Sequence, residues 1–256
     1  MKNKVVLMVV VLAIILSSCG ENLLNDNSTK TTGKDMLGLI MQSNGIPDDL
    51  HYSFFVYKSK QSLLIDANDS LYSIIDSEYS DYYNAYLFDY AGNVSIANHN
   101  LTHSSNGTYN NFSNIVDLDG NDKEYVVQGS VDVPAISFEL ENPLNYANIL
   151  LPSHGSVHDN DNSLTVTWTP EPTKNMTVML TLISEASDPL YPGIEDKVIA
   201  DTGTCTFTAS ELQQFKTGIL KILLRRGNYK FGYASNGKQY GAFAFSQNSI
   251  DIILND

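Results

Sequence analysis

The chain is poor in cysteine, in basic residues and in long apolar runs, and each shortage excludes a class of protein. Two cysteines in 256 residues exclude a fold held together by a network of disulfides. The 15 lysines and arginines are outnumbered by 29 aspartates and glutamates. A body this acidic repels phosphate backbones, so we expect no nucleic-acid partner. Charged residues are only 17% of the chain while tyrosine occurs 15 times, which favours β-structure over helical bundles.

The longest apolar run lies at the N-terminus, in residues 5–16, directly after Lys2 and Lys4. It is about twelve residues long, whereas a membrane-spanning helix needs about 20. A basic start followed by an apolar run of this length is typical of a secretory signal peptide. We therefore predict that residues 1–18 are a cleaved signal peptide, and we predict no membrane span after it.

The residues around the expected cleavage site are Leu16, Ser17, Ser18 and Cys19. This stretch resembles the lipobox of bacterial lipoproteins, of the kind found in Bacteroidetes-like cell envelopes. The resemblance implies cleavage before Cys19 and covalent lipid on its thiol. Each buried acyl CH₂ contributes about 0.8 kcal/mol, and more than one chain gives stable anchoring. The alternative is a lone cysteine that follows a signal peptide by chance.

Further consequences follow from a lipidated Cys19. Cys205 is then the remaining cysteine, so no disulfide within the chain is expected. Gly20 follows the lipidation site, and by resemblance to lipoprotein sorting in Gram-negative bacteria this permits the outer membrane. Whether the body faces the periplasm or the outside stays open.

After the signal peptide we expect a tether and two β domains. Residues 19–34 are polar and predict a flexible tether beginning at the lipidated cysteine. Residues 35–143 form the first predicted domain and residues 144–256 the second, with the boundary at Asn142-Pro143. In the first domain, residues 136–140 alternate apolar and polar side chains, which predicts a half-buried strand. Residues 84–90 also read as a strand, with Tyr86, Phe88 and Tyr90 on one face.

The second domain has the cleaner pattern. Leu164, Val166 and Trp168 alternate with threonines, and Cys205 and Phe207 do the same, so each set is expected to face a core. Thr208 followed by Glu211 fits a capping box at the start of a short helix. About seven short strands in this domain indicate an antiparallel sandwich.

The stretch from Ile149 to Arg226 resembles fibronectin type III and immunoglobulin-like domains. The residues that carry the resemblance are Pro152, Gly155, Thr167-Trp168-Thr169-Pro170, Asp201-Thr202-Gly203 and Leu212. It implies an all-β fold of two sandwich-like domains, in which the second has Trp168 as its core tryptophan. It implies no particular activity, because this architecture hosts many functions.

Two groups of polar residues are candidate metal sites. Asp117, Asp119, Asn121, Asp122 and Glu124 offer oxygen ligands that calcium accepts. An EF-hand loop needs glycine at its sixth position, and here Gly120 is fourth, so an ordinary tight turn is favoured. His154 and His158 have a spacing that suits zinc on a helix, but Pro152 and Gly155 predict a loop. We therefore predict no metal site and no cofactor beyond the covalent lipid.

Tyrosines crowd one stretch of the first domain, at Tyr79, Tyr82, Tyr83, Tyr86 and Tyr90. They could form an exposed platform for sugar rings, but packing within and across strands is favoured. With no catalytic motif in view, we expect a membrane-anchored envelope protein that binds a glycan or a protein partner and is not an enzyme. The alternatives are a glycan-active hydrolase and a structural spacer or assembly factor.

Overall fold

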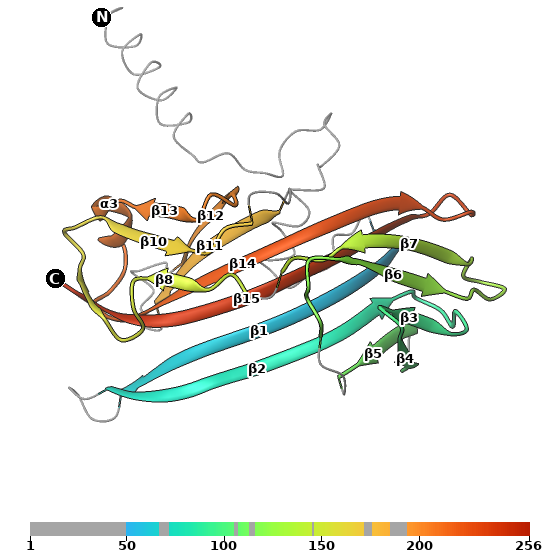
Figure 1. The fold of residues 1–256 in the computed structure, drawn as a ribbon, viewed down its shortest axis with the longest axis horizontal. Coiled ribbons are helices and arrows are strands. Elements are labelled where there is room, and N and C mark those ends of the chain that lie inside the picture. The colour runs from blue at the N-terminus through green and yellow to red at the C-terminus, as the bar shows by residue number, and fades with distance from the viewer. Residues whose placement is uncertain are drawn as a thin grey trace, which may run out of the picture.

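A computed structural model describes residues 50–66, 72–104, 107–112, 116–144, 146–171, 176–184 and 194–256. The predicted signal peptide, Cys19 and the tether lie outside the described residues. Within the described ranges the fold is built almost entirely of strands (Figure 1), so the all-β, sandwich-like prediction is confirmed. No helix in this part of the chain has both the length and the apolar character needed to cross a membrane.

The first half of the chain supplies the long β1–β2 hairpin and several shorter strands at one end of it (Figure 1). They are β1 (Tyr52–Asp66), β2 (Tyr72–Tyr86), β3 (Val94–Ile96), β4 (His99–His103), β5 (Thr108–Asn111), β6 (Asp122–Val127) and β7 (Ile136–Glu141).

The second half adds more strands and one short helix. These are β8 (Ile149–Leu151), β9 (Val157–Asp159), β10 (Leu164–Trp168), β11 (Thr177–Ser184), β12 (Ile194–Ala200), β13 (Thr204–Phe207), α3 (Ala209–Leu212), β14 (Gly218–Tyr233) and β15 (Gln239–Asn255).

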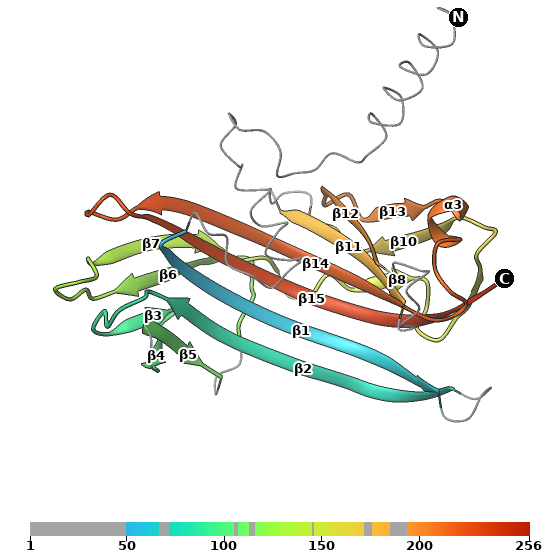
Figure 2. The same ribbon diagram turned by 180° about the vertical axis from the view of Figure 1, so that it is seen from behind.

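Two long hairpins, β1–β2 and β14–β15, form the spine of the molecule (Figures 1 and 2). They meet where β1 pairs in parallel with β15, from Tyr52 opposite Tyr240 to Gln61 opposite Ser249. The resulting large sheet has the strand order β12-β11-β14-β15-β1-β2-β5-β4-β3-β6-β7, with β9 also paired to β15. A smaller sheet has the order β13-β10-β8.

The first core lies among β1–β7 and one end of β15. Phe138 on β7 stacks on Tyr125 of β6, with 4.9 Å between ring centroids, and on Tyr240 of β15, at 4.8 Å. β7 is also tied to β14, because Lys230 donates to the Glu139 carbonyl at 2.8 Å and Asn228 to the Glu141 carbonyl at 2.9 Å. Side chains rather than a backbone ladder therefore hold β7 against β14.

The second core lies between the small sheet and β11, β14 and β15. Leu164, Val166 and Trp168 are buried there, as the alternating pattern predicts, and Trp168 is the core tryptophan. The capping box is confirmed as well, since Glu211 N donates to Thr208 Oγ1 and the Glu211 carboxylate accepts from Thr208 N. Cys205 is half-buried against this core beside the buried Phe207.

A buried ionic cluster closes one end of the second core. Arg226 on β14 pairs with Asp201, at 2.9 Å from Nε to Oδ2, and with Glu171, at 3.1 Å from Nη1 to Oε2. Asp201 also accepts from Trp168 Nε1 at 2.6 Å. Glu171 in turn accepts from the backbone amide of Leu144 at 3.1 Å. The cluster therefore fastens the segment that leaves the first core onto the second.

The last hairpin belongs to both cores. Ala242 and Ala244 on β15 lie in the first core, whereas Ile250 and Ile252 on the same strand lie in the second. The expected division at 143/144 thus passes between two cores, but the residues assigned to the second domain also complete the first. The physical reason is length, because strands of 16 and 17 residues extend well beyond the usual five or six.

The tyrosine-rich stretch packs on both faces of the large sheet. Tyr83 is buried in the first core. Tyr82 and Tyr86 face the other side, because side chains alternate along a strand. There they join a third apolar cluster built on Phe55, Phe243 and neighbouring rings. The side chain of Tyr79 lies outside the described residues. Packing therefore accounts for Tyr82, Tyr83 and Tyr86, and Tyr90 alone of the described members is exposed.

Candidate functional site

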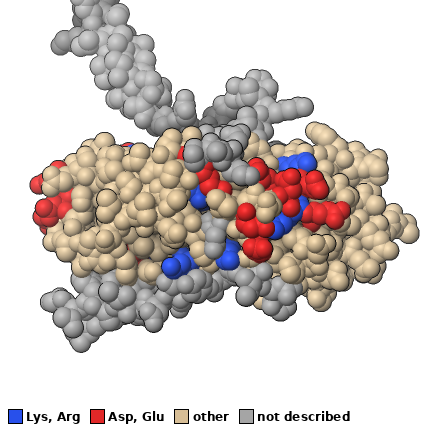
Figure 3. All heavy atoms as spheres, in the orientation of Figure 1, with Lys and Arg blue, Asp and Glu red and all other residues tan. Residues whose placement is uncertain are grey.

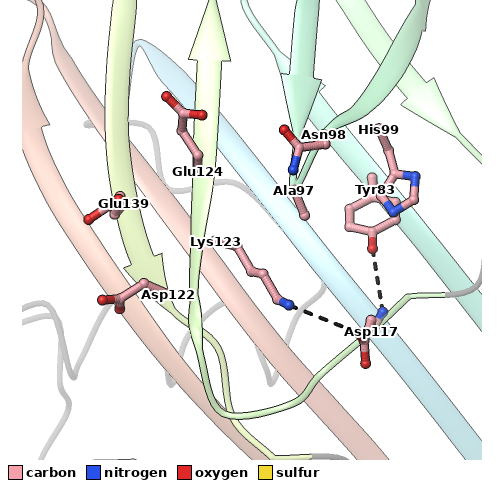
Figure 4. A pocket seen from close by; sticks show the side chains of 9 residues that line it. All are labelled: Tyr83, Ala97, Asn98, His99, Asp117, Asp122, Lys123, Glu124 and Glu139. Carbon is pink, nitrogen blue, oxygen red and sulfur yellow. Dashed lines mark hydrogen bonds and ion pairs between the residues drawn. The ribbon is translucent and has the colours of Figure 1, made fainter.

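A pocket of about 310 Å³ lies beside the β3–β4 turn, at the end of β6 and β7 nearer the second core (Figure 4). It contains three of the five residues that were candidates for calcium. Its lining residues are Tyr83, Ala97, Asn98, His99, Asp117, Asp122, Lys123, Glu124 and Glu139.

Asp119, the central calcium candidate, is engaged within the protein instead. Lys123 Nζ lies 2.9 Å from Asp119 Oδ2 and 4.0 Å from Asp117 Oδ2. The Asn121 amide donates to Asp119 Oδ1 at 3.0 Å. The hydrogen bond from Lys123 is the main cause that lowers the pKa of Asp119 to about 2. This is the tight turn that the sequence favours, closed by an ion pair.

The remaining carboxylates of the pocket do not converge. In Figure 4, Lys123 points toward Asp117, whereas Asp122, Glu124 and Glu139 lie apart from one another. Among the described residues, no group of three or more His, Cys, Asp or Glu side chains is placed to hold a metal ion. Tyr83 and His99, whose rings stack at 4.9 Å, and Glu139 join the pocket from other strands. No local sequence signal connects these three residues.

The two histidines whose spacing was weighed for zinc are separately engaged. His154 Nδ1 lies 3.1 Å from the carbonyl of Asp251, and His158 Nε2 lies 3.1 Å from the carbonyl of Asn162. His154 follows β8 in a loop and His158 lies on β9, so the pair does not share a helix. Burial raises the pKa of the Cys205 thiol, which fits a packing residue rather than a reactive thiolate.

A second candidate site lies at the far end of the first core, which we call the tip. It comprises Leu50 and His51, which directly precede β1, the connections 87–93 and 128–135, and residues 233–239 around the β14–β15 turn. Gly129 N donates to the Ala91 carbonyl at 2.9 Å, which joins 128–135 to 87–93, and His51 N donates to the Gln239 carbonyl at 3.1 Å, which joins residue 51 to the hairpin. The two pairs meet where the rings of His51 and Phe88 stack. Figures 1 and 2 show the β6–β7 and β14–β15 connections at this end.

The tip exposes large apolar side chains. Phe88, Tyr90 and Tyr233 are 61%, 60% and 67% exposed, and Val131 is fully exposed. Single exposed apolar residues are common on protein surfaces, but exposed aromatic rings on loops that a rigid sheet positions are a frequent means of recognition. Asp89 between the two rings, and Asn236 and Lys238 on the hairpin, are exposed as well.

Phe88 is held in an unusual conformation. Its φ is 66°, a left-handed value that is uncommon for a bulky residue. Gly107 packs directly against it, so that a Cβ at Gly107 would lie 2.2 Å from the Phe88 carbonyl carbon. The strand expected over residues 84–90 is therefore wrong beyond Tyr86, where β2 ends. Strain of this kind is concentrated at functional sites in proteins.

The ring of Phe88 is supported from one side by His51. The two rings are stacked, with 5.2 Å between centroids and 29° between planes. His51 Nε2 lies 2.7 Å from Lys238 Nζ. Burial lowers the pKa of His51 and Lys238 lowers it further, while Asp89 opposes them. The neutral imidazole is therefore favoured under Phe88.

The neighbouring Tyr90 is fixed through its backbone. Ser130 Oγ donates to the Tyr90 carbonyl at 2.6 Å, and the amide of Ala91 donates to the hydroxyl of Tyr109 at 2.8 Å. His103 meets the Tyr90 ring edge-on, at 5.3 Å. The loop that carries Phe88 and Tyr90 is thus anchored at both aromatic positions while the rings stay exposed.

Comparison with known proteins adds little. No family model matches the chain, and no curated protein matches it. Among solved structures the chain is similar to the FN1-FN3 domains of chicken CNTN1, with 9% identity and a TM-score of 0.19. The match covers 79% of this chain and 59% of that fragment. At this TM-score the similarity carries no argument, so the all-β assignment rests on the strand pairing.

Proposed function

We propose that this protein is an exported envelope lipoprotein, anchored through lipid on Cys19, whose folded body acts by binding a partner at the tip. The observation that carries the binding role is the set of exposed rings on mutually bonded loops. Loops held by a rigid sheet are the usual place for recognition in β-proteins. Anchoring is supported by the sequence alone, through the apolar run and Leu16-Ser17-Ser18-Cys19. The outer membrane is the expected location.

Anchoring is tested by metabolic labelling of bacteria that express the full chain, with an alkyne-tagged fatty acid. The native protein should carry the label and stay with the membrane fraction. Cys19→Ala should lose both, whereas Cys205→Ala, which alters the other cysteine, should keep both. An unlabelled native protein would contradict the lipoprotein assignment.

The side of the membrane is tested by protease treatment of intact cells. If the body faces outward, external protease should digest the native protein. If it faces the periplasm, digestion should require a permeabilised outer membrane. The first result directs the search for a partner to external surfaces, and the second to the envelope.

A glycan-active hydrolase is the second candidate, because Asp122, Glu124 and Glu139 line an open pocket. Hydrolysis of a glycosidic bond needs two carboxyl groups about 5–9.5 Å apart across the bond. New reducing ends, released from polysaccharide by the purified protein and abolished in Glu139→Gln, would favour the enzyme. If neither the native protein nor Glu139→Gln releases reducing ends, the binding role is favoured.

A further inference from the structure

We propose that the tip is a carbohydrate-binding surface for neutral sugar rings, with Phe88 as the stacking platform. This inference rests on the proposed binding role and names the class of its partner. A sugar ring presents C–H bonds on its flat side and hydroxyls at its rim. Its receptor therefore needs an open aromatic face with hydrogen-bonding groups beside it.

Phe88 supplies such a face. His51 stacks against one side of the ring, yet the residue remains 61% exposed. The backbone at this position is held by Gly107, whose carbonyl accepts from Leu87 N at 2.9 Å. The platform is therefore oriented before any ligand arrives, which lowers the entropy that binding costs.

Polar groups stand beside the platform. Lys238 lies next to His51 and is exposed. Asn236 is held on the hairpin, with its amide donating to the Tyr52 hydroxyl at 3.0 Å. Asp89 directly follows Phe88 and is exposed. Together these side chains provide donors and acceptors within the same set of loops, which suits the hydroxyl rim of a sugar.

The charge distribution favours a neutral sugar. The chain carries a net charge of −14, which repels acidic polysaccharides. On the face shown in Figure 3, the largest group of charged side chains lies right of the middle of the molecule and is mostly acidic. On the tip itself, the exposed Asp89 and Asp132 add to the repulsion of an acidic ligand.

A carbohydrate also fits better than a protein. The cores of protein interfaces are depleted of charged residues. Here Asp89 separates Phe88 from Tyr90, and Ser130 and Asp132 flank Val131. Along these two loops the exposed apolar residues thus alternate with exposed charged and polar ones.

The test uses the full chain, purified in detergent, on a microarray of neutral and acidic oligosaccharides. Neutral oligosaccharides should bind, and titration calorimetry should then show about a tenfold or greater loss of affinity for Phe88→Ala. Phe88→Trp, which keeps a flat ring, should retain binding. Phe112→Ala is the matched control, because Phe112 is exposed to a similar extent, at 66%, but directly follows the end of β5 that is farther from the tip.

Phe88→Asn separates binding from folding. Asparagine is tolerated at left-handed φ values, so its thermal unfolding midpoint should equal or exceed that of the native protein while binding is lost. Binding of acidic oligosaccharides alone, no binding on the array, or an equal loss in Phe112→Ala would each overturn the inference. If the protein instead captures a protein partner, and Phe88→Ala abolishes that capture, the carbohydrate assignment is wrong and the proposed binding role stands.

Discussion

At the scale of single residues, alternation along a strand determines which face of the sheet each side chain lies on. At the tip, the left-handed backbone conformation of Phe88 determines that its ring is exposed. Tyr82 and Tyr83 are adjacent, yet they lie in different apolar clusters on opposite faces of one sheet. Phe88 breaks the alternation because its φ of 66° turns the chain out of β2. The exposed ring at the tip is therefore a product of backbone conformation rather than of strand register.

The contact between Gly107 and Phe88 gives a first prediction. Gly107 has a φ of +68°, which costs an L-residue about 1–2 kcal/mol, and an added Cβ would also collide with the Phe88 backbone. We expect Gly107→Ala to lower the free energy of unfolding by at least about 2 kcal/mol, measured by urea denaturation. Gly237→Ala is the control, because its φ is +78° but nothing lies within 4 Å of the added Cβ. If both variants lose the same free energy of unfolding, the backbone near Phe88 shifts to make room for the new Cβ and the contact itself costs nothing.

The lowered pKa of Asp119 gives a second prediction, on pH dependence. Its pKa of about 2 in the folded protein lies below the ordinary value of 3.8. The ionised carboxylate therefore stabilises the fold fully above about pH 4, and this stabilisation is lost as the pH falls toward 2. Because the pair with Lys123 is partly exposed, we expect Asp119→Asn to cost only about 0.5 kcal/mol at pH 7.

Denaturation of native and Asp119→Asn proteins across pH 2–7 checks this expectation. The difference in unfolding free energy should shrink as the pH falls below 4. A difference that is constant over this range would mean that packing, not charge, accounts for the effect.

At the scale of elements, the buried ionic cluster joins the ends of β10 and β12 to the middle of β14. The side chains of Arg226 and Asp201 are each only 2% exposed. Removing one member of a buried ion pair leaves the other charge without compensation, which costs about 3–5 kcal/mol.

We therefore expect Asp201→Ala to lower the free energy of unfolding by about 3–5 kcal/mol. Part of this loss comes from Trp168, whose indole N–H also donates to Asp201. Asp132→Ala at the exposed β6–β7 connection should stay within about 0.5 kcal/mol of the native protein. A small effect of Asp201→Ala in calorimetry would show that water or another donor replaces the lost carboxylate.

At the scale of the whole molecule, the shared hairpin should make the two cores unfold together. β15 contributes side chains to both cores, so losing either core exposes part of the other. The chain has a single tryptophan, and Trp168 lies in the second core. Its fluorescence therefore reports on one core, while far-ultraviolet circular dichroism reports on all strands.

The test is Phe138→Ala in the first core, which should cost about 3–5 kcal/mol. With coupled cores, the denaturant midpoint followed by Trp168 fluorescence should fall together with the midpoint followed by circular dichroism. Val131→Ala, at a fully exposed position, should move neither. An unchanged fluorescence midpoint in Phe138→Ala would show that the cores unfold independently.

Local patterns in the sequence determined the strands of the second core, the capping box at Thr208 and Glu211, and the core position of Trp168. They succeeded because each depends on neighbours within a few residues. The same is true of the turn at Asp119. The predicted signal peptide and lipidation at Cys19 also come from sequence alone and stay predictions.

Tertiary structure alone decided the parallel pairing of β1 with β15, which joins residues 52–61 to residues 240–249. It also decided that the last hairpin contributes to two cores. The alternation of side chains along β15 is the same in both cores, so the sequence pattern does not show where one core ends and the other begins. The tip depends on the same long-range pairing, since His51, Phe88 and Lys238 are far apart in sequence and meet only where their strands end. Patterns within a short stretch of sequence cannot show that these three residues are in contact, so the tip could not be predicted from the sequence.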